Sequence, residues 1–357
     1  MTFAFFKDIP WGWEARRALL MLAADESPAA DRAAAERQYP GRAAFLRNRY
    51  RLAEEAFADL RAALTPLEEP LHFLFAPLPD TNLTPIDCLL GTSPAVLLGA
   101  FDRNALLAAH GVLFHNFAAD VLDVEDDDPI LEPVRGDLRA LFRLLSAHGV
   151  GQTTLSAMLR VTTETEALLD TALAALHAAM VSLRTRETAF LADRAPFLAM
   201  TDDDAKQLLR TVKIVLPDTA RINVYAASIS PAHASLTLHQ GVYTFILSPY
   251  VIEHVELAPD GEPLSAAYVQ AALHMMTDKT KLDILRRLAQ RSWYGAELAE
   301  ALGLSGATVS HHMGQLLSQS LVRIESVGNR LYYHLCRELA KELIDQLAAL
   351  LDVEGEP

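Results

Sequence analysis

Hydrogen-bonding side chains recur between residues 305 and 315, in a stretch otherwise rich in small residues. Ser305, Thr308, Ser310, His311 and Gln315 carry hydroxyl, imidazole and amide groups. Such groups can recognise the donor and acceptor pattern that each base pair presents in the major groove of DNA. Ser305 also suits a helix cap, and a helix N-terminus favours phosphate. We expect these residues to contact DNA, with Ser310 and His311 as the best candidates for direct base contacts.

A second polar set follows at Arg323, Asn329 and Arg330. These side chains could bind phosphate or the minor groove, and the alternative is that they are ordinary solvated residues of a hairpin. His311 and His312 form no metal site as a pair, because consecutive helical side chains diverge. We expect His312 to be half-buried instead.

Two short helices must come before the first polar set. Residues 278–290 begin with Asp278, a suitable N-cap, and place Leu282, Leu285 and Leu288 three apart, which predicts a helix with one buried face. A second helix is predicted to end at Gly303, a residue suited to a left-handed C-terminal cap. Two helices joined by a short turn form a helix-turn-helix.

The polar set itself lies on a third predicted helix, which starts at Ser305. Val309, Met313 and Leu316 are spaced four and three apart and would be buried, so the opposite side is small and polar. Beyond this helix, residues 321–326 and 331–335 are short β-prone runs separated by a turn with Gly and Asn, which predicts a hairpin. The whole segment is therefore predicted to be a winged helix-turn-helix.

The same segment resembles a known family over about 75 residues, from near 264 to near 336. The motifs that carry the likeness are Thr280-Lys281-Leu282-Asp283-Ile284-Leu285, Glu297-Leu298-Ala299, Leu304 to His312, Leu321-Val322-Arg323 and Arg330-Leu331-Tyr332-Tyr333. They resemble the winged helix-turn-helix of the arsenical-resistance-repressor (ArsR) family of bacterial transcription regulators. The resemblance implies a homodimer whose recognition helices enter major grooves of double-stranded DNA, with each wing near the flanking backbone or minor groove.

Two departures from the family pattern concern metals and base contacts. Residues 293–296 read Trp-Tyr-Gly-Ala where metal-sensing members have a Cys pair, and residues 337–352 contain no His. We therefore expect neither of the family's metal sites and no cofactor. Gly306-Ala307 and Gly314 replace a polar pair and a basic residue, so base recognition would rest on Thr308, Ser310, His311 and Gln315.

Other candidates for chemistry are weak. His110, His115 and Asp120 are five residues apart on a predicted helix, so each is rotated by about 140° and the three cannot converge. The acidic run at 125–128 is typical of a solvated loop, and 149–154 lacks the P-loop Lys and is interpreted as a turn between helices. No nucleophile elbow, C-x-x-C or H-E-x-x-H motif is present, and we expect no enzyme.

Composition indicates a globular protein with two or three domains. The chain has 357 residues, 51% hydrophobic and 22% charged, with a net charge of −15. Residues 265–350 carry +1 and residues 1–264 carry −13, which would suppress non-specific DNA binding. Cys88 and Cys336 are expected to be reduced thiols in a cytoplasm. No export signal and no apolar stretch of membrane-spanning length is expected.

The N-terminal part is predicted to be mainly helical, with long helices around 46–64 and 169–183 and shorter ones at 95–121, 134–147 and 202–212. Alternation between about 214 and 257 predicts a small antiparallel sheet. The domains expected are an acidic regulatory or oligomerisation domain at 1–257, a linker at 258–263, the winged helix-turn-helix at 264–351 and an acidic tail at 352–357. The fold class is thus mainly α with small β elements.

We therefore expect a cytoplasmic transcription regulator, a dimeric repressor that binds an inverted repeat and has an unknown small-molecule effector. Predicted helices at 265–276 and 337–351 would form the dimer interface or, alternatively, pack on the N-terminal domain. The rival hypothesis makes the N-terminal domain an enzyme or small-molecule sensor, and a deep pocket with converging polar groups would favour it. A third makes the winged domain a protein-interaction module.

Overall fold

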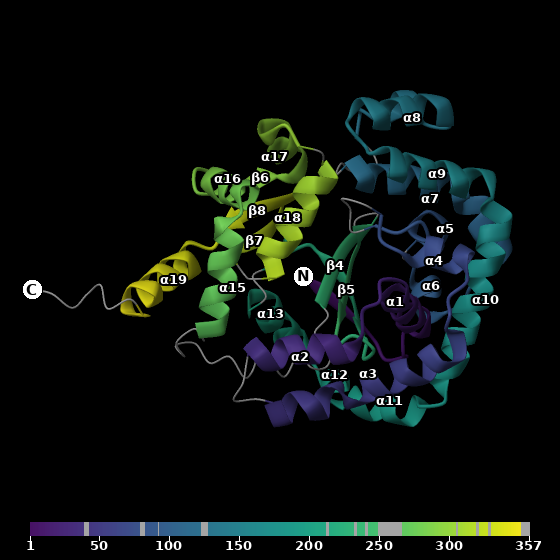
Figure 1. Cartoon of the computed structure of the whole chain (residues 1–357), viewed down its shortest axis with the longest axis horizontal. Coiled ribbons are helices and arrows are strands. Elements are labelled where there is room, and N and C mark those ends of the chain that lie inside the picture. Colours follow the sequence, from purple (N-terminus) through teal and green to yellow (C-terminus); the bar gives the residue numbers. More distant parts are fainter. Residues whose placement is uncertain are drawn as a thin grey trace, which may run out of the picture.

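Helices make up most of the structure and surround two small sheets (Figure 1). The computed structural model describes residues 1–38, 43–78, 83–91, 93–122, 128–211, 214–231, 234–239, 242–248, 266–304, 306–318, 321–327 and 330–350. We call residues 1–248 the N-terminal region and residues 266–350 the winged domain. The predicted linker at 258–263 and tail at 352–357 lie outside the described residues, so the domain boundaries stay a prediction.

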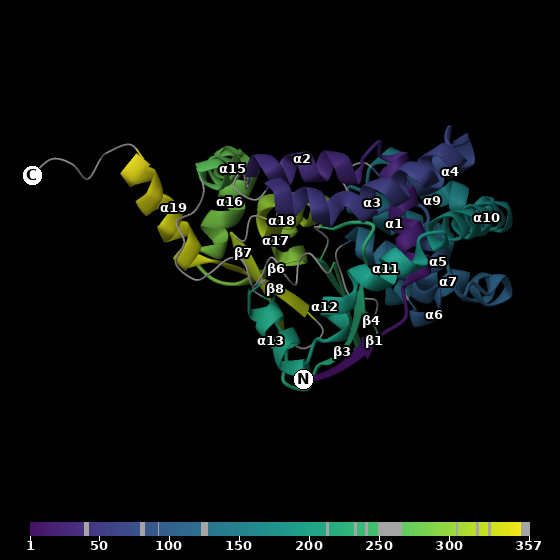
Figure 2. The same ribbon diagram turned by 90° about the horizontal axis from the view of Figure 1, so that it is seen from below.

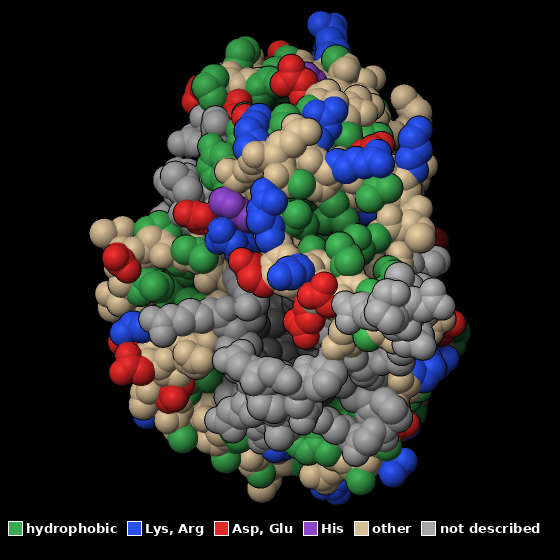
Figure 3. All heavy atoms as spheres, turned by 90° about the vertical axis from the view of Figure 1, so that its left-hand side faces the viewer, with side chains coloured by type: hydrophobic (Ala, Val, Ile, Leu, Met, Phe, Trp, Pro, Cys, Tyr) green, Lys and Arg blue, Asp and Glu red, His purple; other side chains and the backbone are tan. Residues whose placement is uncertain are grey.

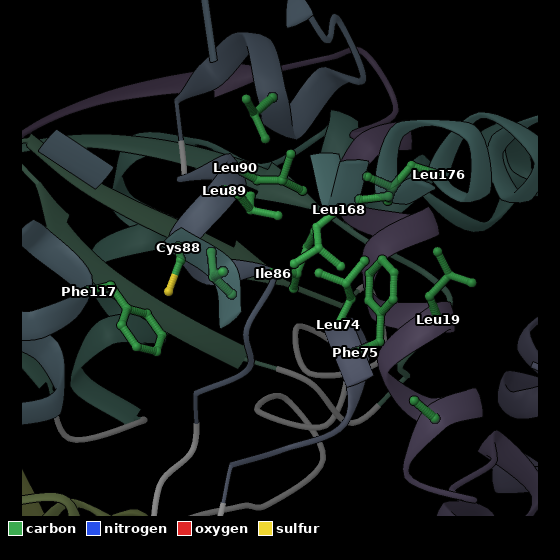
Figure 4. Close-up of a cluster of buried hydrophobic side chains, with 14 of the residues drawn as sticks. Leu19, Leu74, Phe75, Ile86, Cys88, Leu89, Leu90, Phe117, Leu168 and Leu176 are labelled. Atoms are coloured by element: carbon green, nitrogen blue, oxygen red, sulfur yellow. The ribbon is translucent and has the colours of Figure 1, made fainter. Parts of the chain in front are cut away.

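The N-terminal region is predominantly helical, as predicted. Its helices are α1 (Trp11–Ala23), α2 (Pro28–Gln38), α3 (Ala43–Leu64), α4 (Glu69–Phe75), α5 (Asp87–Leu90), α6 (Pro94–Leu98), α7 (Arg103–Leu122), the 3₁₀ turn η2 (Glu132–Val134), α8 (Leu138–Ala147), α9 (Gln152–Thr163), α10 (Thr165–Arg184), α11 (Glu187–Asp193), α12 (Ala195–Leu198) and α13 (Asp202–Thr211). Most of them contribute to one large hydrophobic core, part of which is shown in Figure 4. The long helices predicted around 46–64 and 169–183 are α3 and α10, and each buries one apolar face.

The helix predicted over 95–121 is two helices. α6 ends at Leu98 and α7 begins at Arg103, because Gly99 adopts a left-handed φ of 86°. The backbones of Gly12 and Gly99 meet here, and a Cβ on Gly12 would lie 2.0 Å from the carbonyl oxygen of Val96. The chain therefore turns where α1 crosses α6, and only glycine fits the crossing.

Two core helices are more apolar than we expected from the sequence. α7 and α10 each contain an 18-residue window of mean hydropathy 1.4 and 1.3, long and apolar enough to cross a membrane by composition alone, so the expectation of no such stretch was wrong. Both helices contribute buried side chains to the large core, including Phe117 and Leu176 (Figure 4). Their apolar composition is thus accounted for by packing inside the N-terminal region.

The N-terminal sheet is mixed, and the prediction of an antiparallel sheet was only partly right. Its strands are β1 (Thr2–Phe6), β3 (Arg221–Ala226), β4 (Ala234–His239) and β5 (Val242–Leu247), in the order β1-β3-β5-β4. The β4–β5 hairpin is antiparallel as expected, with Leu238 opposite Tyr243, but β1, β3 and β5 are parallel. Parallel strands need a crossover connection. For the pair β3 and β5, β4 provides this connection, because it lies on the far side of β5 and β5 is therefore the neighbour of β3.

The winged domain contains α15 (Ala266–Thr277), α16 (Lys279–Leu288), β6 (Trp293–Tyr294), α17 (Gly295–Leu302), α18 (Gly306–Ser318), β7 (Val322–Val327), β8 (Arg330–Leu335) and α19 (Arg337–Leu350). The predicted caps at Asp278 and Gly303 are confirmed. The Lys281 N–H donates to the Asp278 carboxylate at 2.9 Å and caps α16, and Gly303 ends α17 with a φ of 66°. A hydrophobic cluster made of this domain's own residues forms a second core.

The predicted two-stranded wing belongs to a larger sheet of order β2-β7-β8-β6. β7 and β8 form the expected hairpin, with Ile324 opposite Tyr333, although residues 328 and 329 of its turn lie outside the described residues. β6 adds a short strand beside β8, and β2 (Ile214–Val215) of the N-terminal region pairs in parallel with β7. In Figures 1 and 2, α19 projects from the edge of the winged domain farthest from the N-terminal helices.

Candidate nucleic-acid interface

The helix that carries the predicted base contacts is α18. Val309, Met313 and Leu316 lie at 0–1% exposure on its inner face and anchor it in the core of the winged domain. Ser310 directly follows this anchor and His311 comes one residue later, so both lie in the first half of α18. Ser305 lies outside the described residues.

The flank of α18 next to the anchor is partly covered. Thr308, His312 and Gln315, spaced four and three apart, are half-buried, which was expected for His312 alone. His312 lies close enough to Asp278 to influence it: the Lys281 N–H chiefly holds the pKa of the Asp278 carboxyl below its usual range, with the Lys281 and His312 charges adding to the effect. This flank therefore faces the start of α16. Thr308 and Gln315 are less exposed to solvent than residues on the outward face of the helix would be.

One of the basic residues predicted on the wing, Arg323, lies close to a carboxylate. Arg323 of β7 lies opposite His334 of β8, and half-buried Glu325 lies two residues further along β7. The Glu325 carboxylate is 2.9 Å from Nε2 of His334 and 3.7 Å from the Arg323 guanidinium. Arg330 starts β8 opposite Val327, and Asn329 lies outside the described residues.

Glu325 and His334 are residues that the sequence analysis missed. Burial mainly lowers the pKa of His334, the Arg323 charge lowers it further, and Glu325 opposes both. The Arg323 charge is thus partly offset by a carboxylate on the same strand face. The alternation of Arg323 and Glu325 along a predicted strand could have indicated this pair, because residues two apart on a strand share a face.

Trp293 is the centre of an aromatic clamp between α16 and α17. The indole N–H of Trp293 donates to the Arg287 carbonyl oxygen at 3.1 Å, and the Arg291 guanidinium lies 3.5 Å from the centre of its ring. This contact joins the end of α16 to the start of α17 through a cation–π interaction. Cys88 and Cys336 are both buried free thiols, and the described residues contain no group of three or more His, Cys, Asp or Glu arranged to hold a metal.

Positive charge is also present on the face of the winged domain turned away from the N-terminal helices. Figure 3 shows Lys and Arg side chains gathered on the upper part of this face. The exposed basic residues of the domain include Lys279, Arg286, Arg291, Arg337 and Lys341. These charges can attract a polyanion over a distance, although none of them lies on α18.

The N-terminal region holds one buried charge cluster among its described residues that could suggest catalysis. Glu14 is fully buried, and its carboxylate accepts hydrogen bonds from the backbone N–H groups of Ser228 and Ile229 at 2.6 and 2.9 Å. Burial raises the pKa of Glu14 to about 7. Arg194, also fully buried, donates to the carbonyl oxygens of residues 6, 7 and 8. These bonds tie α1 and α12 to the ends of β1 and β3, so the cluster joins elements of the fold.

A cavity of about 310 Å³ lies where β1 ends. It is lined by Lys7, Asp8, Ile9, Trp11, Leu98, Glu187 and Leu191. Its charged residues are exposed, and the cavity is open to solvent. It therefore lacks the enclosed, converging polar groups that the enzyme hypothesis would need.

Comparison with known proteins concerns the winged domain. Residues 276–325 match a helix-turn-helix domain family. The chain is 33% identical over 76 residues to the HTH-type transcriptional regulator KmtR of Mycobacterium tuberculosis, which covers 21% of this chain and 58% of that protein. It is 29% identical over 84 residues to the arsenical resistance operon repressor of Staphylococcus aureus, or 24% of this chain and 81% of the relative. No solved structure matches the chain significantly.

These matches fall on the segment whose motifs resembled the family. Two helices, a glycine-capped turn, the anchored helix α18 and the β7–β8 hairpin follow one another in the order expected of a winged helix-turn-helix. The C-terminal part of this chain is therefore an ArsR-type helix-turn-helix DNA-binding domain, homologous to these transcription regulators.

Proposed function

We propose that the chain is a sequence-specific transcription regulator, a dimeric repressor that binds an inverted repeat in double-stranded DNA. α18 would enter a major groove, and the β7–β8 wing would lie against the flanking backbone. The observation that carries this proposal is the winged helix-turn-helix on its own core, with α18 anchored by Val309, Met313 and Leu316. Ser310 and His311 would contact bases, supported by Thr308 and Gln315, while Ser305, Arg323, Asn329 and Arg330 would contact phosphate or the minor groove.

The dimer would form through α15 and α19. These two helices contact each other, and α19 buries Leu343 at 1% exposure while Ile344 next to it is 60% exposed. Leu339 and Leu347 are half-buried on the same helix. A second copy would cover this remaining apolar surface, and a two-fold axis would place two α18 helices on two half-sites.

The acidic N-terminal region would regulate DNA binding in the cytoplasm, in response to a small-molecule effector and without the family's thiolate metal site. The aromatic clamp at Trp293 supports the last point, since it fills the position of the thiolates. The rival hypothesis of an N-terminal enzyme has less support, because Glu14 is engaged by two backbone amides and the cavity at the end of β1 is open.

The test is selection of genomic DNA fragments on purified full-length protein at about 150 mM salt, where binding to the DNA backbone alone is weakened. We expect enrichment of one palindromic site. Recovery of fragments with no shared sequence would contradict the proposal and direct attention to the N-terminal region.

A further inference from the structure

Elements of the N-terminal region contact both parts of the winged domain that the proposed function assigns to DNA. α7 contacts α18, and β2 pairs with β7 so that Ile214 lies opposite Ile324 and Val215 opposite Glu325. In Figures 1 and 2, α18 lies at the edge of the winged domain nearest the N-terminal helices. The recognition helix and the wing are thus engaged within the chain itself.

Residues 110–119 of α7 include buried side chains on two opposite sides of the helix. His110 of α7 meets Thr165 of α10 at 3.3 Å and the backbone of Cys88 in α5, which marks the side that α5 and α10 cover. Phe117, seven residues after His110, shares that side and lies near Cys88 in Figure 4. Ala119 is rotated by about 200° from Phe117 and is nevertheless fully buried. Ala119 belongs to the large hydrophobic core of the N-terminal region, so α7 is anchored there while it contacts α18.

The β2–β7 pair adds a second attachment. β7 would be the edge strand of the wing sheet without β2, because β8 and β6 lie on its other side. Backbone hydrogen bonds of a paired edge hold a strand in place. The wing is therefore fixed to the N-terminal region beside Glu325, the residue that offsets the charge of Arg323.

A second helix held against α18 adds to the width that a major groove must admit. The groove is about 12 Å wide and an α-helix with side chains is about 10–12 Å across, so the groove admits one helix. Packed helices lie about 8–10 Å apart, so α7 on the groove-facing side of α18 would meet the DNA before α18 reached the bases.

We propose that the structure is a closed, autoinhibited arrangement in which α7 and β2 compete with DNA for α18 and the wing. DNA binding requires these two contacts to open, and an effector that loosens or strengthens them would control the regulator. This inference rests on the proposed function, because it assumes that α18 binds DNA.

Hydrogen exchange of the full-length protein, with and without the DNA fragment recovered by genomic selection, tests the opening. We expect DNA to slow exchange in α18 and β7–β8, to speed it about tenfold in β2, which loses its partner strand, and to speed it in α7. Slower exchange in α18 with no change in α7 and β2 would overturn the closed arrangement and leave the proposed function standing. No change anywhere in residues 266–350 would instead count against DNA binding itself.

A variant at the contact gives a second measurement. Val215→Pro removes a backbone N–H from β2, and Val215→Thr is the control because it keeps that N–H at the same 44% exposed position. We expect Val215→Pro to bind the selected DNA about tenfold more tightly than wild type, a typical size for such coupling, with no change for Val215→Thr. Unchanged affinity in a folded Val215→Pro protein would refute the proposal. Loss of folding, checked by circular dichroism, would leave the decision to hydrogen exchange on the wild-type chain.

Discussion

Ser310 and His311 are the residues on which base recognition depends in this account. They follow the anchored Val309 in the first half of α18, the part of a recognition helix that contacts bases. We predict that Ser310→Ala and His311→Ala each weaken binding to the selected site by about 1–3 kcal/mol, because each removes a hydrogen-bonding group from the groove. Fluorescence anisotropy with selected and random DNA measures the effect. Equal losses on both DNAs would make these residues phosphate contacts.

Glu325 is predicted to weaken DNA binding. Its carboxylate lies 3.7 Å from Arg323 and would repel phosphate, so Glu325→Gln frees one positive charge on the wing. We expect affinity to rise by about three- to tenfold at low salt and the gain to shrink as salt increases. Glu68→Gln in the N-terminal region is the matched control, since Glu68 is exposed and the variant changes the net charge equally away from the wing. An equal gain in both variants would mean that only net charge matters.

Glu14 should make stability depend on pH. Burial raises its pKa from 4.5 to about 7, so the folded protein binds a proton that the unfolded chain releases between these values. Stability should therefore fall as pH rises from about 4.5 to 7, by about 3 kcal/mol from this residue, and then level off. Denaturant unfolding at several pH values, compared with Glu14→Gln, isolates the contribution. The same pH dependence in both proteins would show that Glu14 does not titrate in this way.

The dimer hypothesis depends on the exposed apolar surface of α19. Ile344 is 60% exposed, so its replacement should not disturb the core of one chain. We predict that Ile344→Glu raises the dimer dissociation constant by at least about tenfold, because a charge would be buried at the interface. Sedimentation equilibrium measures this, and Val181→Glu, at a 58% exposed position on α10, is the control. A dimer unaffected by Ile344→Glu would place the interface elsewhere.

The elements of the winged domain could be predicted because their determinants are local. Asp278 caps α16, Gly303 ends α17, and Val309, Met313 and Leu316 form one buried face, all within a few residues in sequence. The partial burial of Thr308 and Gln315 could not be predicted from helical spacing. It depends on where α18 packs against the start of α16.

Long-range pairing accounts for the other differences. β1 and β3 are about 220 residues apart in sequence, and β2 has only two residues, too few for an alternating pattern. The break between α6 and α7 arises from a helix crossing at Gly12, which lies far from Gly99 in sequence. These contacts are set by the packing of the whole N-terminal region, so patterns within a short window do not contain them.

In the whole molecule, the charge distribution and the closed arrangement both weaken binding to random DNA. Residues 1–264 carry −13 and residues 265–350 carry +1, so the N-terminal region repels DNA while α7 and β2 occupy α18 and the wing. Attraction to random DNA is therefore weak, and affinity must come from contacts that a matching site alone can supply. Such a chain has a low affinity for random DNA and a high selectivity for a matching site.

The proposed function depends on sequence-specific DNA binding by the full-length chain. Its most direct test is the ratio of dissociation constants for the selected fragment and for a shuffled fragment of equal length and composition, at about 150 mM salt. We predict at least about thousandfold tighter binding to the selected fragment, within the usual range for specific regulators. Equal affinity for the two fragments would contradict it.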